Sequence, residues 1–127
     1  MTVMKLLIVE EDGAFRDFLR LRAAEQAGEN IPDIFEAATL GDALRILRDE
    51  AIDAVICDEA FPPGLGDRMG DPSGWRANSV TLREECLTRK VGFVLLRGDD
   101  QRKLLMARGA IDHVLALAST RPMVSTK

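Results

Sequence analysis

Short apolar runs alternate with amphipathic stretches along nearly the whole chain, and this alternation constrains the fold more than any other feature. In the stretches between the runs, apolar residues recur at the three- and four-residue spacing of helices. Strict alternation of this kind predicts a parallel sheet with helices on both faces. At 127 residues the chain is long enough for one such domain. The predicted strands are residues 5–9, 34–38, 53–58, 91–96 and 113–117, and the predicted helices are 14–27, 42–49, 79–89 and 100–108.

The overall composition excludes several classes of protein. The net charge of −4 gives no support to a nucleic-acid surface, and no apolar run approaches the length of a membrane span. Since the first residues lead into a strand rather than a signal peptide, we expect a cytoplasmic protein. The two cysteines are too few for a disulfide framework, and Cys57 is expected to be a small buried hydrophobe in the third strand.

Acidic residues stand where two of the predicted strands end. Glu10 and Glu11 follow the first strand, and Asp58 ends the third. In a flavodoxin-like order, 2-1-3-4-5, these strands are neighbours at the topological switch point, so their acids would share one pocket. Clustered carboxylates favour a bound cation, and Mg²⁺ is the natural choice for oxygen ligands. Mg²⁺ beside a carboxylate suggests phosphoryl transfer onto Asp58; the alternative is that Asp58 only caps a turn or the next helix.

The sequence resembles the receiver domains of two-component response regulators from Lys5 to about Leu117. The resemblance rests on the acids after "KLLIV", on "FEAATLGDALRIL", on "DAVICDEAFPPG" around Asp58, and on "ARGAIDHVL". It implies that Asp58 accepts a phosphoryl group from a histidine kinase or phosphotransfer protein, and that Glu10, Glu11 and the carbonyl of Ala60 hold Mg²⁺ with it. The domain would then be a signalling module with a downstream protein partner, and not an enzyme.

Several positions depart from the pattern of that family. The second acid is Glu11 where the family typically has aspartate, and one extra methylene moves its carboxylate by roughly 1.5 Å, which disturbs the octahedron of Mg²⁺. The hydroxyl residue that ends the fourth strand aligns with Leu96 or Arg97, depending on the register. On the fifth strand, Ala116 stands at the lysine position and His113 at the aromatic switch position.

Arg97 is the candidate substitute for the missing lysine. Its guanidinium would pair with Asp58 or with a phosphoryl oxygen if the register places it at the pocket rim. The alternative is a solvated arginine in the loop before Asp99. These departures predict an atypical receiver.

The end of the sequence predicts an incomplete sheet face. Only ten residues follow the fifth predicted strand, so a fifth helix of normal length is expected to be absent or truncated. Val114 and its neighbours would then face water, which indicates a homodimer or partner contact on that face. We assign residues 1–118 to the receiver domain and 119–127 to a tail or the start of a linker.

A long segment rich in glycine and proline, residues 61–78, contains Trp75, which is expected to anchor a loop to the domain. A capping box at Thr81 and Glu84 predicts the start of the third helix. Three alternatives to a phosphorylated receiver remain: a phosphorylation-independent protein-interaction module, a small-ligand- or flavin-binding domain on the same architecture, and a hydrolase using the acids and Mg²⁺. The acidic loop after the first strand has the wrong charge for a phosphate-binding loop, and no base or substrate pocket for a hydrolase is evident.

Overall fold

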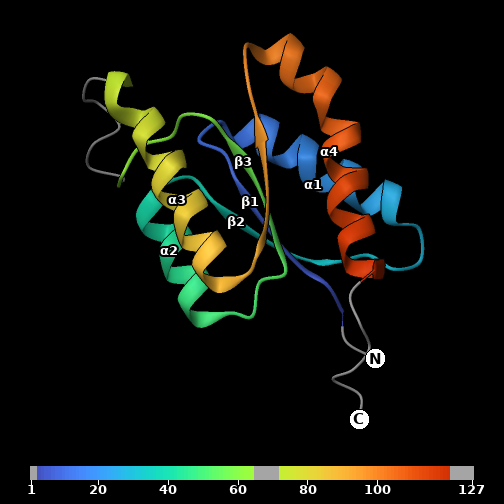
Figure 1. Ribbon diagram of the computed structural model, residues 1–127. Coiled ribbons are helices and arrows are strands. Elements are labelled where there is room, and N and C mark those ends of the chain that lie inside the picture. Colours follow the sequence, from blue (N-terminus) through green and yellow to red (C-terminus); the bar gives the residue numbers. More distant parts are fainter. Residues whose placement is uncertain (1–2, 65–71, 121–127) are drawn as a thin grey trace.

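The computed structural model describes residues 3–64 and 72–120. Strands and helices alternate in these residues (Figure 1), and the first four predicted strands are confirmed within one residue at each end. A short 3₁₀ turn, Pro72–Gly74, precedes the third helix. The elements are β1 (Lys5–Val9), α1 (Gly13–Ala27), β2 (Asp33–Ala37), α2 (Leu40–Asp49), β3 (Ala54–Asp58), α3 (Trp75–Arg89), β4 (Gly92–Leu96) and α4 (Asp100–Thr120).

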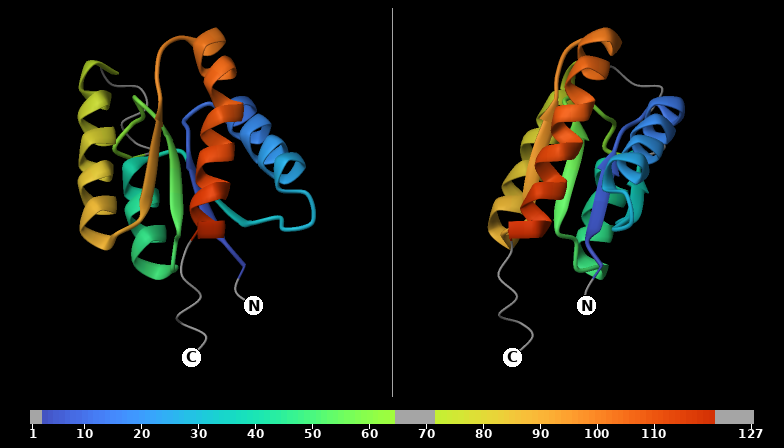
Figure 2. Two further views of the ribbon diagram at one scale, coloured as in Figure 1. Left: turned by 45° about the vertical axis from the view of Figure 1, so that its right-hand side comes forward. Right: turned by 90° about the vertical axis from the view of Figure 1, so that its right-hand side faces the viewer.

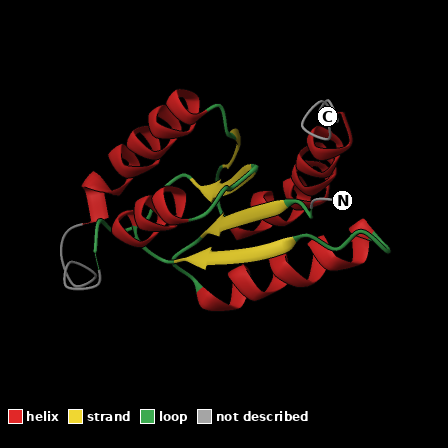
Figure 3. Cartoon of the chain, turned by 90° about the horizontal axis from the view of Figure 1, so that it is seen from below, coloured by secondary structure: helices red, strands yellow, loops and turns green. Residues whose placement is uncertain are grey.

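The four strands form one parallel sheet in the order β2-β1-β3-β4. This confirms the predicted order 2-1-3-4 for the first four strands. Helices lie on both faces of the sheet (Figure 3): α1 and α4 cover one face, and α2 and α3 cover the other. The chain therefore has the doubly wound α/β architecture that the alternation of apolar and amphipathic segments predicted.

Each face of the sheet is closed by its own apolar core. Alternate residues of β1 point to opposite faces, so Leu6 and Ile8 belong to the core under α1 and α4, whereas Leu7 and Val9 belong to the core under α2 and α3. These four side chains are completely buried. The central strands are thus apolar on both faces, as parallel strands covered by helices must be.

The helices begin and end at residues whose chemistry fits those positions. The Asp12 carboxylate accepts hydrogen bonds from the backbone N–H groups of Ala14 and Phe15, which caps α1. The hydroxyl of Thr39 caps α2 in the same way. Gly28 ends α1 with a φ of +65°, a conformation that glycine adopts without strain.

The fifth strand predicted at residues 113–117 is wrong, because these residues form part of α4. The helix does not end at Gly109 but continues to Thr120, running back alongside β4 and next to α1 (Figure 2). Ile111 is completely buried against the sheet, and the Gln26 side chain of α1 donates a hydrogen bond of 2.7 Å to the Asp112 carboxylate. Packing against α1 and the sheet therefore holds this segment in a helix, although a short apolar run of this kind is typical of a buried strand.

The expectation that Val114 faces water is also wrong. Val114 is completely buried in the core between α1, α4 and the sheet. The helix α4 lies on the face that was expected to remain open, so the reason for predicting a homodimer there no longer holds. The predicted domain boundary between 118 and 119 falls inside α4, and residues 121–127 lie outside the described part of the chain.

The third helix begins earlier than predicted. It starts at Trp75, which is half-buried, rather than near residue 79. Thr81 is not a cap, because its hydroxyl donates to the Ala77 carbonyl oxygen inside the helix. The segment 65–71 lies outside the described residues. The Asn78 side chain donates to the Phe61 carbonyl oxygen at 2.8 Å and so ties the first turns of α3 to the chain that follows β3.

Among the described residues, none of the helices has the length and apolar character needed to cross a membrane.

Candidate functional site

Glu10 and Asp58 meet where β1 and β3 end. The two strands are adjacent, with Val9 paired to Cys57 in the parallel register, so the residue after each pair extends from the same edge of the sheet. The Glu10 side chain is 3% exposed and that of Asp58 is 14% exposed. The structure thus places two of the three predicted acids, Glu10 and Asp58, at the same edge of the sheet.

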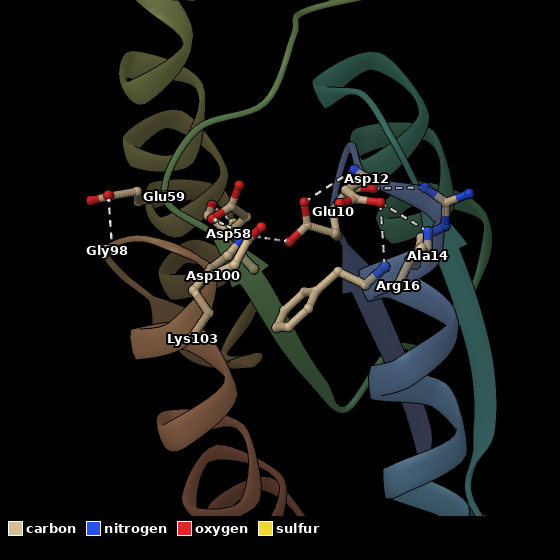
Figure 4. A network of polar contacts seen from close by, with 11 residues as sticks. Glu10, Asp12, Ala14, Arg16, Asp58, Glu59, Gly98, Asp100 and Lys103 are labelled. Atoms are coloured by element: carbon tan, nitrogen blue, oxygen red, sulfur yellow. Dashed lines mark hydrogen bonds and ion pairs between the residues drawn. The ribbon is translucent and has the colours of Figure 1, made fainter.

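The ammonium group of Lys103 lies against both carboxylates (Figure 4). Its Nζ atom is 3.0 Å from Oε1 of Glu10 and 3.3 Å from Oδ1 of Asp58. The Lys103 side chain is only 7% exposed, and its Nζ also lies 4.6 Å from the centre of the Phe15 ring. Oδ1 of the exposed Asp100 is farther away, at 3.8 Å. One buried cation therefore neutralises part of the charge of two buried acids and is further stabilised by an aromatic face.

The first turn of α4 is placed by polar contacts on its loop. The Asp99 carboxylate accepts a hydrogen bond from the Arg102 N–H, which caps α4. Gly98, with φ of +92°, donates its N–H to the Glu59 carboxylate at 3.2 Å. The Glu59 N–H in turn donates to the Leu96 carbonyl oxygen. The ends of β3 and β4 are thereby joined, and the turn that follows holds Lys103 beside Asp58.

The pKa values of the three groups shift upward together. Burial, and then the charge of Asp58, raises the pKa of Glu10, although Lys103 opposes this. Burial also raises the pKa of Asp58 by more than the Lys103 charge lowers it. Burial alone would lower the pKa of Lys103, but its hydrogen bond and charge interaction with Glu10, together with Asp58, raise it. Lys103 is therefore held in its charged form, and its charge offsets only part of the cost of burying the two carboxylates.

The other predicted ligands differ from this pair in their surroundings. Glu11 is half-buried on the loop after Glu10, and Ala60 is half-buried two residues after Asp58. Asp12, the next acid along the chain, caps α1, and its backbone N–H donates to the Glu10 carboxylate at 3.1 Å. In the described part of the chain, no three or more His, Cys, Asp or Glu side chains are grouped to hold a metal ion.

The structure settles the register at the end of β4. Leu96 pairs with Asp58 across the sheet, and its side chain is completely buried in the core. Arg97 is exposed, and the cation against Asp58 is Lys103 instead. His113 and Ala116 are exposed on α4. His113 is ten residues beyond Lys103, which is about 15 Å along a helix, and its predicted place on a fifth strand is wrong because it lies in α4.

The geometry does not fit a Mg²⁺ ion bridging Glu10 and Asp58. Such an ion would have to approach oxygen atoms of both carboxylates to about 2.1 Å. The ammonium of Lys103 already contacts one oxygen of each. A metal that bridged the two acids through Oε1 of Glu10 and Oδ1 of Asp58 would therefore compete with the ammonium for these two atoms.

Lys103 is the site residue that sequence reasoning missed. The predicted pocket was built from strand ends, and the cation comes from a helix. A signal was nevertheless present, because Lys103 lies in one helical stripe with the buried residues Ala107, Ala110, Ile111 and Val114. A lysine at the end of a buried stripe is expected to place its ammonium at the edge of the core.

Comparisons with known proteins agree with this geometry at the level of the fold. No protein-family model matches the sequence, and no curated protein matches it. Among solved structures, the chain is similar to the non-phosphorylated receiver domain of the stress response regulator RcsB from Escherichia coli, with 18% identity and a TM-score of 0.54 over 87% of this chain and 77% of that one. It is also similar to a mutant of the response regulator MaeR bound to sulfate, with 14% identity and a TM-score of 0.53 over 94% of this chain and 100% of that one. The chain has the receiver-domain fold of response regulators.

Proposed function

We propose that this chain serves two-component signal transduction as a receiver-type domain, and that it acts as a protein-binding module without needing a phosphoryl group on Asp58. The receiver fold supports the signalling role. The single observation that carries the second part is the position of Lys103, whose ammonium contacts both acids of the pocket and is itself nearly buried.

The Lys103 contacts oppose phosphoryl transfer in two ways. An ion-paired carboxylate is a weaker nucleophile than a free one, because attack removes electron density from the oxygen that the cation stabilises. In addition, the charge on a transferring phosphoryl group needs a cation aligned with its equatorial oxygens. Lys103 is instead engaged with Glu10 at 3.0 Å.

The exposed surface of α4 supports a role in binding a protein partner. Leu104, Leu105 and Met106 follow Lys103 and are exposed by 47%, 84% and 41%. Three consecutive exposed apolar side chains are unusual on a solvated helix and are typical of a contact surface. A histidine kinase, a phosphotransfer protein or a downstream protein would be the natural partner of such a domain.

A second function is favoured by one specific observation. Asp58 retains 14% exposure of its side chain and has a cation at 3.3 Å, so Lys103 could act on a phosphoryl group in place of the lysine that sequence reasoning found missing. In this second function Asp58 is a phosphoacceptor within a phosphorelay.

Phosphorylation of the intact protein separates the two functions. The protein is incubated with acetyl phosphate and Mg²⁺ and its intact mass is measured, with Asp58→Asn as the matched control. We expect no phosphoryl mass shift in either protein. A shift in the wild type that disappears in Asp58→Asn would overturn the phosphorylation-independent proposal and support the phosphoacceptor.

A further inference from the structure

Lys103 lies between Glu10 and Asp58, the two acids to which the sequence analysis assigned a divalent cation. Its Nζ contacts one oxygen of each acid, and the chain supplies this cation from α4, which follows β4 directly. A bound metal can dissociate, whereas a lysine is covalently attached and remains at a fixed local concentration.

We propose that Lys103 is an intramolecular replacement for the metal ion of this pocket. With Lys103 present the protein has no functional Mg²⁺ site, and without Lys103 its two acids form one. The proposal deepens the proposed function, but it is tested by metal binding and not by phosphoryl transfer.

The local contacts explain why the lysine excludes the metal. Glu10 also accepts a hydrogen bond from the Asp12 N–H at 3.1 Å, so both of its carboxylate oxygens are engaged. The Lys103 ammonium also lies over the Phe15 ring, 4.6 Å from its centre. To admit a hydrated ion, the ammonium would have to leave both acids and the ring, and the first turn of α4 is fixed by the Asp99 cap.

Removing only the charge of Lys103 leaves the acids in place. In Lys103→Met the side chain keeps a similar length, and Glu10 and Asp58 become a buried pair of like charges. Such a pair favours a divalent cation with oxygen ligands. The variant therefore gains affinity for Mg²⁺, whereas Lys103→Arg, which keeps the charge, does not.

The test measures Mg²⁺ binding by calorimetry and by the melting temperature in MgCl₂, against NaCl of equal ionic strength. We expect no saturable binding to the wild type or to Lys103→Arg. For Lys103→Met, we expect a rise in melting temperature of roughly 5 °C at a tenfold excess of Mg²⁺ over its dissociation constant. The double variant Lys103→Met, Asp58→Asn lacks one acid and is expected to lose this response.

Two outcomes would overturn the proposal. One is saturable Mg²⁺ binding to the wild type with the same affinity as to Lys103→Met. The other is a Lys103→Met variant with no response to Mg²⁺. If this variant does not fold in salt alone, the same criterion applies to its folding: Mg²⁺ must restore the folded protein, and failure to do so counts against the proposal. None of these outcomes depends on whether Asp58 is phosphorylated.

Discussion

The two faces of the sheet are closed in the same manner, by two helices each, but they differ in charge. The face under α2 and α3 has an apolar core that includes Cys57 and Cys86, where burial raises the pKa of the Cys86 thiol to about 12. The face under α1 and α4 has an apolar core of similar size, and α4 also brings the buried ammonium of Lys103 to the strand ends. A single helix, α4, thus closes a core along its length and supplies a site residue from its first turn.

Removing the charge of Lys103 is expected to have the largest effect on stability. Lys103→Met leaves Glu10 and Asp58 without their cation, and breaking a buried ion pair in this way typically costs about 3–5 kcal/mol. Urea unfolding measures the loss. The matched control is Arg102→Met, one residue earlier and exposed, which should change stability by less than about 0.5 kcal/mol. Equal losses in the two variants would mean that Lys103 does not form the buried ion pair with Glu10 and Asp58.

A core substitution in α4 tests whether the helix closes its face. Ile111 is completely buried, so Ile111→Ala should lower the free energy of unfolding by about 2–5 kcal/mol. His113→Ala, two residues later on the exposed side of the same helix, serves as the control and should be nearly neutral. If both substitutions were neutral, α4 would not be packed on the sheet.

Glycine substitutions distinguish a continuous α4 from a helix that ends before a fifth strand. Gly109 lies inside α4 with no atom within 4 Å of an added Cβ. Gly109→Ala is therefore expected to stabilise the protein by about 1 kcal/mol. Gly28→Ala should be destabilising, because Gly28 has a φ of +65°. A destabilised Gly109→Ala variant would instead indicate a helix C-terminus at this residue.

The smallest effect that we expect is on the pH dependence of stability. The folded pKa of Asp58 is raised, so the folded protein binds more protons than the unfolded chain just above the ordinary carboxyl pKa. Stability from this group is present below that pKa and is lost as the pH rises through the raised value. Urea unfolding at several pH values should show this loss in the wild type relative to Asp58→Asn. A relative gain in stability with rising pH would contradict it.

The raised pKa of Lys103 also makes the stability of the protein depend on pH, in the alkaline range. Its folded pKa is raised, so the stability it contributes is present below the ordinary lysine pKa and is lost as the pH rises through the folded value. Lys103→Met should not show this alkaline loss.

Most of the fold was predictable from sequence because its patterns are local. Strands such as Lys5–Val9 are apolar after their first residue, and caps such as Asp12 and Thr39 act on the helix that follows them. The fifth strand was predicted wrongly because residues 113–117 satisfy a strand pattern and a helical stripe equally well. Contacts with α1 and the sheet, which are distant in sequence, select the helix.

The candidate site was predictable only in part, because one of its three charged groups is placed by contacts between segments distant in sequence. Glu10 and Asp58 follow neighbouring strands, so topology alone brings them together. Lys103 reaches the pocket from α4, which packs on the same face of the sheet as α1. Because the sequence analysis ended this helix early and placed a fifth strand after it, the contact was not predicted. Arg97 was considered in its place because it stands nearer to the strand end in sequence, but the register points it to solvent.

A double-mutant cycle between Lys103 and Asp58 tests the central claim most directly. Urea unfolding of the wild type, Lys103→Met, Asp58→Asn and the double variant gives the coupling energy of the pair. Contact at 3.3 Å with both side chains largely buried predicts a favourable coupling of at least about 1 kcal/mol. A coupling indistinguishable from zero would show that the ammonium does not sit against Asp58 and would contradict the account.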